Sequence, residues 1–310
     1  MKRYSCGHSF LLGVNKPLGL SSHDVVSCVR RFVGESKVGH AGTLDPAASG
    51  VLVIGVGQAT RLLGHLTLDD KCYLARITFG SETSTDDAEG EVVRTAPVEG
   101  KLADAEYARG VLESLEGEHD QIPPAYSAIS VGGTRAYALA RKGADVELEA
   151  RHIAIYDATL VSIDDSDGIS WICSFSVSKG TYIRSIARDL GRSLGTAAHL
   201  SGLSRTASGT LGLERCISLG ELEQDGLSAA LDRMLDPLEL LGIPSASASE
   251  GDIEDILCGK SISAGLFPGI PDGGEVCVIC GGRLWSLAYR EAGRIAARAN
   301  FPDGIEGVLR

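Results

Sequence analysis

The segment that decides the fold joins a glycine-rich loop to a strongly apolar stretch, and it is GHAGTLDPAASGVLVIGV, residues 39–56. Glycines at 39 and 42 allow an irregular backbone path, and Pro46 stiffens the exit from the loop. Asp45 is therefore displayed on a loop rather than fixed inside regular structure. An isolated Asp-Pro pair is most often a simple turn. Asp45 becomes a candidate for chemistry only in the company of residues such as His40.

Regular structure is predicted on both sides of this loop. Ser21 and Asp24 form a capping-box pattern ahead of apolar residues at helical spacing, which predicts a helix that ends at Gly34. Val51–Ile54 and Lys71–Phe79 are typical of strands. The remaining pattern predicts an acidic turn at 82–91, a helix at 103–117, a rigid segment at 121–124, a strand at 127–131, a basic helix at 135–141, a strand at 171–177 and a helix at 182–190 closed by Gly191.

Three side chains hold positions that are unusual for their type. Arg184 falls in the first turn of the 182–190 helix, where a cation opposes the helix dipole unless a carboxylate pairs with it. Asp45 is a candidate for that partner, and a solvated arginine is the alternative. Lys179 continues the alternation of the preceding strand, so its stem is predicted to point inward. Tyr73 lies in a strand, where it would pack in the core or stack on a flat ligand.

Length and composition are those of an ordinary globular protein. The 310 residues are 44% hydrophobic and 23% charged. Apolar runs stay far below the roughly 18 residues of a membrane span, and no signal-peptide pattern follows Met1. We therefore expect a cytoplasmic protein with reduced cysteines and no membrane contact. Cys277 and Cys280 form a CxxC without a second pair, which favours a strand over a zinc site.

The net charge of −12 argues at first against a nucleic-acid partner. Its distribution along the chain changes that conclusion. Residues 1–65 hold 7 basic and 3 acidic residues, and residues 175–215 hold 6 and 2, whereas residues 69–121 and 220–275 are strongly acidic. The positive segments are thus predicted to bind RNA with a strong dependence on salt.

Two further patterns concern cofactors and domains. Gly55–Thr60 follows a strand, but Thr60 replaces the third small residue of a dinucleotide-binding loop and no βαβ unit is evident, so a tight turn is favoured. Residues 244–249, PSASAS, are a candidate linker. Beyond it, strand-like runs at 276–279 and 284–289 suggest a small, mostly β domain.

Five motifs in series, over about residues 12–215, resemble the family of bacterial tRNA pseudouridine synthase B (TruB). They are VNKPLGLSS at 14–22, GHAGTLDPAASGVL at 39–52, KCY at 71–73, QIPPAYSA at 121–128 with residues 133–143, and SKGTYIR at 178–184 with HLSGL at 199–203. Any one of these motifs alone is weak, whereas five in order are highly specific. The family usually has Leu-Arg-Arg-Thr where this chain has LSRT at 203–206, so one expected RNA contact is missing.

The resemblance implies an α+β fold with a mixed, mainly antiparallel central sheet flanked by helices and loops, the pseudouridine synthase fold. Residues 1–243 would form the catalytic domain, with an RNA-gripping insertion at about 119–145. Residues 250–310 would form a small, mostly β, PUA-like domain. The implied reaction isomerises uridine 55 in the TΨC loop of tRNA without cofactor, dinucleotide or metal. We expect a monomer, because the tRNA is itself a large partner.

The resemblance also assigns roles to the matched residues. Asp45 would be the nucleophile, attacking ribose C1′ or uracil C6 or acting through a glycal, and Arg184 would keep it ionised. Tyr73 would stack on the uracil and handle the C5 proton, and His40 would fill the space left by the flipped base. Contacts with the RNA, or support of the site, would come from Lys16, Lys179, Tyr182, Leu203, Arg135, Arg141 and Arg205.

Two other functions remain open. One is a non-catalytic tRNA-binding or folding factor, against which the joint presence of Asp45, Tyr73 and Arg184 argues. The other is a related synthase that acts on ribosomal RNA or within a guide-RNA particle. The lack of long basic tails and the bacterial-type spacing of the motifs make it the weaker alternative.

Overall fold

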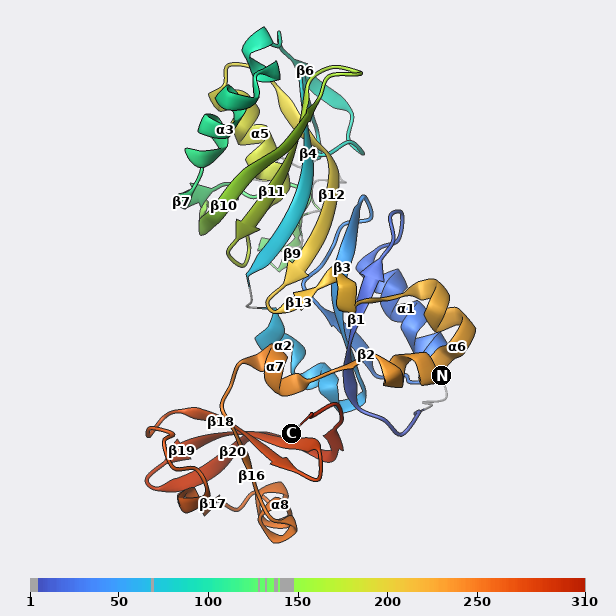
Figure 1. Cartoon of the computed structure of the whole chain (residues 1–310), viewed down its shortest axis with the longest axis vertical. Coiled ribbons are helices and arrows are strands. Elements are labelled where there is room, and N and C mark those ends of the chain that lie inside the picture. Colours follow the sequence, from blue (N-terminus) through green and yellow to red (C-terminus); the bar gives the residue numbers. More distant parts are fainter. Residues whose placement is uncertain are drawn as a thin grey trace. The chain divides into compact units, whose positions relative to one another are not determined.

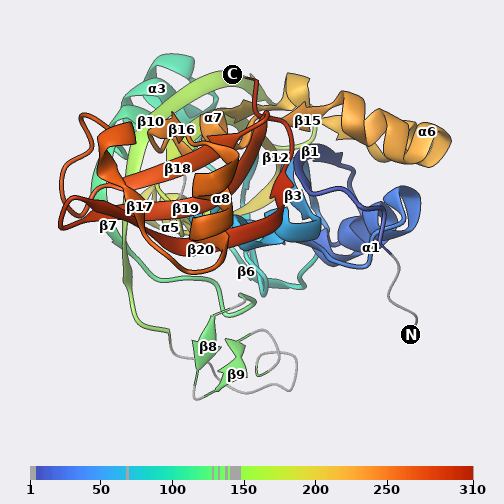
Figure 2. The same ribbon diagram turned by 90° about the horizontal axis from the view of Figure 1, so that it is seen from below.

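The chain divides into two compact units, drawn in Figures 1 and 2. Unit 1 comprises residues 1–46, 50–68 and 207–310, and unit 2 comprises residues 47–49 and 69–206. The structure, a computed structural model, describes residues 5–67, 70–127, 129–131, 133–136, 139 and 148–309. Each unit carries some of the sequence motifs, so each is described by itself.

The first sheet of unit 1 combines strands from the start of the chain with strands from residues 217–235. β1 (Phe10–Lys16) pairs antiparallel with β3 (Ala48–Val56) and parallel with β14 (Ile217–Ser218). β2 (Val38–Ala41) pairs with β3, and β15 (Met234–Leu235) pairs with β1. The strand predicted at Val51–Ile54 is confirmed as part of β3.

Helix α1 (Ser22–Val33) packs against α6 (Leu219–Asp232) beside these strands. The Ser21 hydroxyl accepts a hydrogen bond from the backbone of Asp24, whose carboxylate bonds back to Ser21, and Gly34 ends α1 in the left-handed conformation. The helix predicted from the capping box is therefore confirmed. Its buried valines share a core with apolar residues of β1, β3 and α6. The shorter elements of this part are η1 (Gly57–Arg61), α2 (Leu63–Leu66), β13 (Leu211–Gly212), η3 (Leu213–Arg215) and α7 (Pro237–Leu241).

The C-terminal part of unit 1 is a five-stranded sheet in the order β16-β18-β19-β20-β17. Its elements are β16 (Ser245–Ser247), α8 (Glu250–Leu257), β17 (Ile262–Ser263), η4 (Ala264–Leu266), β18 (Glu275–Cys280), β19 (Arg283–Glu291) and β20 (Arg294–Ile305). The predicted runs at 276–279 and 284–289 are confirmed as strands. The predicted linker is wrong, because Ser245–Ser247 pair in parallel with β18 and Ala246 packs on the core of this sheet.

A single hydrophobic core joins the C-terminal sheet to the first strands of unit 1. Leu11 of β1 and Val51 of β3 belong to the same buried cluster as Leu287 and Phe301. The turn η1 carries the Arg61 guanidinium 5.7 Å from the ring centre of Phe301.

The segment predicted as a tight turn, Gly55–Thr60, packs closely against the backbone near His8 where η1 begins. Gly57 has a φ of 61°, and a Cβ on it would lie 2.5 Å from the backbone oxygen of His8.

The CxxC, Cys277 and Cys280, is confirmed as part of strand β18. Cys277 faces the shared core, whereas Cys280 packs against the separate core under α8.

Unit 2 is built on strands in the order β12-β4-β11-β10-β7, with antiparallel pairing from β4 to β7 (Figure 1). Buried and more exposed residues alternate along β4 and β11, and this alternation had predicted the strand at 171–177. Helix α3 packs against β10, and Trp171 of β11 donates a hydrogen bond to the backbone of Leu102. The bounds are β4 (Lys71–Phe79), β7 (Gly117–Gln121), β10 (Arg151–Asp164), β11 (Ser170–Val177), β12 (Ala198–Ser208), α3 (Ala105–Glu113) and α5 (Ile183–Ser193).

Two helices of unit 2 have bounds that differ from those predicted. Helix α5 does not close at Gly191 but continues to Ser193. Gly191 lies in a close contact instead: a Cβ there would lie 2.5 Å from the backbone nitrogen of Ala198. Helix α3 is shorter than predicted and is capped by the side chain of Asp104. Four short strands and one short 3-10 helix, η2 (Gly100–Ala103), complete the described part of the unit. The strands are β5 (Ser81–Thr83), β6 (Val92–Thr95), β8 (Ser130–Val131) and β9 (Thr134–Arg135), the last two forming a hairpin apart from the sheet (Figure 2).

Candidate active site

The loop that carries Asp45 is held on both sides of that residue by α1 and the turn before it. The Ser22 hydroxyl donates to the backbone oxygen of Leu44 and accepts from its backbone nitrogen, both at 2.9 Å. The backbone N–H of Gly19 donates to the oxygen of Pro46 at 2.9 Å. Asp45 itself is partly exposed. Unit 1 thus fixes the residues before and after a carboxylate that remains accessible.

Lys16 lies at the end of β1 and is fully buried, with 0% of its surface exposed. Its ammonium group donates to the backbone oxygens of Pro17 at 2.9 Å and Leu20 at 2.6 Å, and lies 3.5 Å from that of Pro46. A buried charge needs such compensation. Of the two roles expected for Lys16, support of the site fits this burial and contact with the RNA backbone does not.

His40 stands on β2, opposite Ile54 of β3, five residues before Asp45. Its side chain is partly exposed, and its Nδ1 is buried. The first half of the loop is therefore part of the sheet of unit 1, so that His40 is placed by strand pairing rather than by the loop alone.

In unit 2, Tyr73 lies on β4 opposite Phe175 of β11 and is 9% exposed. It belongs to the buried face of the strand, together with Ala75 and Ile77. Both roles expected for this tyrosine, core packing and stacking on a flat ligand, remain compatible with that position.

Arg184 lies in the first turn of α5, as predicted, and its side chain is 8% exposed. Its guanidinium donates to the backbone oxygens of Thr85 at 3.2 Å and Tyr126 at 3.1 Å, and lies 3.4 Å from the carboxylate of Asp87. Asp45 was the partner predicted from the sequence, and Asp87 was not among the candidates. Within unit 2, Asp87 supplies the negative charge that an arginine at a helix N-terminus needs.

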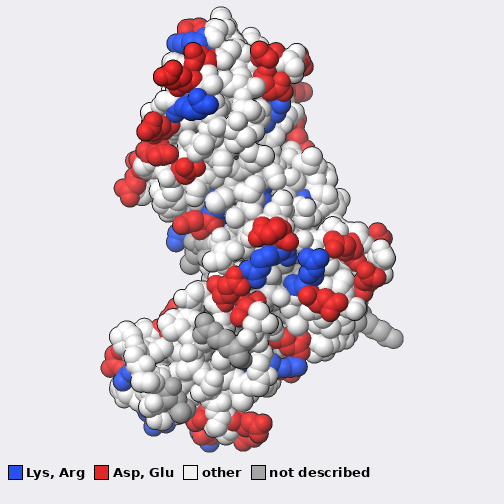
Figure 3. All heavy atoms as spheres, in the orientation of Figure 1, with Lys and Arg blue, Asp and Glu red and all other residues white. Residues whose placement is uncertain are grey.

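The same face of α5 continues this pattern over two more turns. Arg188 pairs with Asp86 at 2.9 Å, and Arg192 pairs with Glu82 at 2.8 Å. Together with Arg184–Asp87 we call these the α5 ion pairs. The separation of charge predicted from the sequence is therefore wrong in unit 2, because the acidic turn at 82–91 neutralises the basic face of α5. On the face drawn in Figure 3, basic and acidic side chains likewise lie next to one another.

Glu82 is the most strongly bound carboxylate of this group. Its side chain is 5% exposed and accepts hydrogen bonds from Arg192 and from Nε of Arg94 at 3.1 Å. Burial alone would raise its pKa, but the hydrogen bonds and charges of Arg192 and Arg94 outweigh burial and lower the pKa to about 2. Burial raises the pKa of Asp86 and the charge of Arg188 opposes that rise.

The remaining expected contacts fall in different environments. Tyr182 is held by Gln121, whose amide oxygen accepts from its backbone nitrogen at 2.9 Å and whose amide nitrogen donates to its backbone oxygen at 3.1 Å. Leu203 is partly exposed on β12, whereas Arg205 is 1% exposed, which does not fit a direct RNA contact. Arg135 ends β9, and Arg141 lies outside the described residues.

The prediction that Lys179 points inward is wrong. Strand β11 ends at Val177, and the Ser178 hydroxyl accepts from the backbone nitrogen of Ala154 at 2.8 Å. The chain then turns and leaves Lys179 exposed. Alternation predicts which way a side chain points only inside a strand, and β11 ends two residues before Lys179.

Sequence reasoning missed three residues that shape these environments: Ser22, Asp87 and Gln121. Ser22 and Gln121 had entered only as members of the motifs at 14–22 and 121–128, with no role of their own. Asp87 and Gln121 lie about 60 to 100 residues from their partners in sequence. Only the order of the strands brings them there, so local patterns carry no signal for them.

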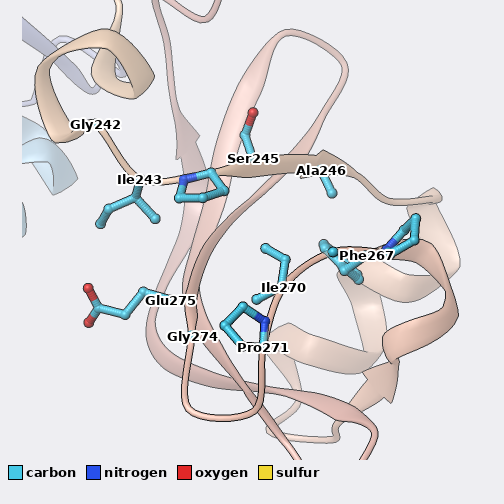
Figure 4. A pocket seen from close by; sticks show the side chains of 12 residues that line it. Gly242, Ile243, Ser245, Ala246, Phe267, Ile270, Pro271, Gly274 and Glu275 are labelled. Carbon is cyan, nitrogen blue, oxygen red and sulfur yellow. The ribbon is translucent and has the colours of Figure 1, made fainter.

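A cavity of about 680 Å³ lies in the C-terminal part of unit 1, beside β16 (Figure 4). It is lined by Gly242–Ala246, Phe267–Pro271, Gly274 and Glu275. Among the described residues that line it, Glu275 is the only ionisable one, and none of them is a residue expected to act in catalysis. Within the described residues, no group of His, Cys, Asp and Glu is arranged to hold a metal ion, and no helix is long and apolar enough to cross a membrane.

The fold has known counterparts among solved structures. A chain in the crystal structure of the archaeal box H/ACA sRNP Nop10-Cbf5 complex superposes with a TM-score of 0.66 over 94% of this chain and 85% of that chain, at 22% identity. A chain of a Cbf5-Nop10-Gar1 complex gives 0.63 over 94% and 84%, at 23% identity. The fold is therefore that of the pseudouridine synthases, as the resemblance implied, with a β-rich C-terminal part.

Comparisons of sequence show which family of pseudouridine synthases the chain belongs to. The family model for the TruB family pseudouridylate synthase (N terminal domain) matches residues 30–183, and that for the tRNA pseudouridylate synthase B C-terminal domain matches residues 184–241. A tRNA pseudouridine synthase B of Mycobacterium sp. (strain KMS) is 43% identical over 86% of this chain and 90% of its own length. That of Geobacillus kaustophilus is 42% identical over 83% and 92%. The chain belongs to the TruB family of pseudouridylate synthases.

Proposed function

We propose that this protein is a tRNA pseudouridine synthase that isomerises uridine 55 in the T-arm of tRNA. The observation that carries the proposal is the Asp45 loop, in which Ser22 and Lys16 fix the backbone around an accessible carboxylate. The TruB relatives, which are named tRNA pseudouridine synthase B, support the activity. Position 55 and the T-arm rest on the family motifs of the sequence.

The reaction is an isomerisation in which all atoms of the substrate are kept. The C1′–N1 glycosidic bond breaks, the uracil turns, and a C1′–C5 bond forms. C5 then loses its proton, and N1 gains one. The target uridine must first leave the base stack, which costs a few kcal/mol.

The family motifs assign four residues to this chemistry. Asp45 is the nucleophile, and its carboxylate must be ionised to act. Arg184 supplies a positive charge whose position is set beforehand by Asp87 and two backbone carbonyls, so little reorganisation is needed during the reaction. Tyr73 stacks on the uracil and handles the C5 proton, and His40 fills the space of the flipped base.

The tRNA is bound by groups around this chemistry and by the C-terminal part. Lys179 is exposed and suited to a phosphate contact, while Tyr182 and Leu203 line the pocket for the base. The catalytic domain is residues 1–243, with an RNA-gripping insertion at about 119–145 that includes Arg135 and Arg141. Residues 250–310 form a PUA-like RNA-binding domain. The protein acts as a cytoplasmic monomer, without cofactor or metal.

The test compares Asp45→Asn and Asp45→Ala with the wild type on an unmodified T-arm stem-loop. We expect pseudouridine formation to fall by more than about 10³-fold, because the nucleophile is lost. The dissociation constant for the RNA should stay within about threefold, since a single carboxylate contributes no phosphate contact. Asp232→Asn, the same change at an exposed helix position, is the matched control. Undiminished turnover by either Asp45 variant would refute the nucleophile assignment.

A further inference from the structure

Arg184 is held by two segments that are far from it in sequence. Its guanidinium donates to the backbone oxygen of Thr85 at 3.2 Å in the first segment, residues 85–87. It donates to that of Tyr126 at 3.1 Å in the second, residues 121–126. The position of this guanidinium therefore depends on how firmly those two segments are themselves held.

Arg188, one turn further along α5, binds the same two segments. Its Nη1 donates to the carboxylate of Asp86 at 2.9 Å, and its Nη2 donates to the backbone oxygen of Ile122 at 2.9 Å. Its Nε donates to Asp189 at 2.8 Å, which holds the fork in place. The side chain is 11% exposed. The Ser185 hydroxyl adds a hydrogen bond of 2.9 Å to the oxygen of Ile122.

Asp86 has a left-handed backbone conformation that its contacts with the rest of unit 2 stabilise. Its φ is 61°, a value that residues other than glycine adopt at a cost of about 1–3 kcal/mol. Its backbone oxygen accepts from the nitrogen of Leu200 on β12 at 3.0 Å. Its carboxylate is 13% exposed and paired with Arg188. A strained backbone and a largely buried carboxylate thus coincide at the residue that meets Arg188.

We infer that Arg188, together with Asp86, is a positioning residue for the isomerisation: it fixes residues 85–87 and 121–126, and these in turn fix the guanidinium of Arg184. The inference rests on the proposed role of Arg184.

The expected effect follows from geometry. A displacement of a reacting group by about 1 Å can cost about 10²-fold in rate. Loss of Arg188 should therefore lower kcat by about 10- to 100-fold. The KM for the RNA should change by less than about threefold, because Arg188 is mostly buried and its described hydrogen bonds go to protein atoms.

The experiment measures kcat and KM of Arg188→Met and Asp86→Asn on the T-arm stem-loop, with Arg192→Met as the matched control. Arg192 lies on the same helix face and is paired with Glu82, so its loss also removes an ion pair from α5. Its described hydrogen bonds reach neither residues 85–87 nor residues 121–126. We expect the loss of kcat in Arg188→Met and Asp86→Asn and near-wild-type values in Arg192→Met, with all variants folded at the assay temperature by circular dichroism.

Equal kcat values for Arg188→Met and Arg192→Met would overturn the inference, and so would a change confined to KM. Should Arg188→Met fail to fold, Asp86→Asn decides alone, because asparagine has nearly the same shape and tolerates the left-handed backbone. A wild-type protein without pseudouridine product would refute the proposed function instead. The two failures are thus distinguishable.

Discussion

Lys16 illustrates how burial revises a role assigned to a single residue. The sequence motif placed it among residues for the RNA or the site, and its full burial assigns it to the backbone around Asp45. Carbonyl oxygens replace the water that the ammonium group loses on folding. The charge therefore stabilises the loop from the inside.

We predict that Lys16→Met lowers both stability and turnover. The change leaves carbonyl oxygens of Pro17 and Leu20 without their donor, which should lower the free energy of unfolding by about 1–3 kcal/mol. Turnover on the T-arm stem-loop should fall by about 10- to 100-fold, since the Asp45 loop is no longer fixed. Urea unfolding and single-turnover rates measure the two effects. Lys37→Met, at an exposed position, should change neither; equal stability of Lys16→Met and the wild type would contradict this role.

A second prediction at the residue scale concerns Glu82 and acid. Its pKa of about 2 in the folded protein lies below the ordinary value of 4.5, so its contribution to stability is complete above pH 4.5 and is lost as the pH falls toward 2. Glu82→Gln should lower the free energy of unfolding by about 1–3 kcal/mol at neutral pH. Measured against pH, the difference from the wild type should shrink below pH 4.5. A difference that is the same at pH 3 and pH 7 would rule out this origin.

At the scale of elements, sequence patterns predicted best where the deciding interactions are local. The capping box of Ser21 and Asp24 placed the start of α1, and alternation from Trp171 to Val177 placed β11. The failures came where a distant segment decides. Residues 245–247 form a strand because β18 lies beside them, and nothing in their own small side chains indicates this partner.

Gly191 gives a test at this scale, because it ended the predicted helix but lies inside the observed one. Gly191→Ala should destabilise the protein by about 1–3 kcal/mol, since the new Cβ would meet the backbone of Ala198. Gly110→Ala on α3 is the matched control: the space there is open, and the change should stabilise by about 0.5–1 kcal/mol. Thermal unfolding of both variants measures the contrast, and stabilisation by both would contradict the close contact.

For the whole molecule, the distribution of charge was the least predictable property. Counting along the sequence separated a basic segment at 175–215 from an acidic one at 69–121, yet folding pairs Arg184, Arg188 and Arg192 with carboxylates of the second segment. Pairing depends on which strands are neighbours, which linear spacing does not encode. The candidate site shows the same limit: the motifs supplied Asp45, Tyr73, Arg184 and the supporting Lys16, while the contacts of Ser22 with Leu44 and of Asp87 with Arg184 came only from the fold.

The central claim concerns the whole protein and its complete substrate. Purified wild-type protein is incubated with a full-length unmodified tRNA transcript, in buffer without added metal or nucleotide, and pseudouridine is mapped along the RNA. We predict that it appears at position 55 and that Asp45→Asn produces none. Absence of product with the wild type, or product only after addition of a metal or nucleotide, would contradict the account.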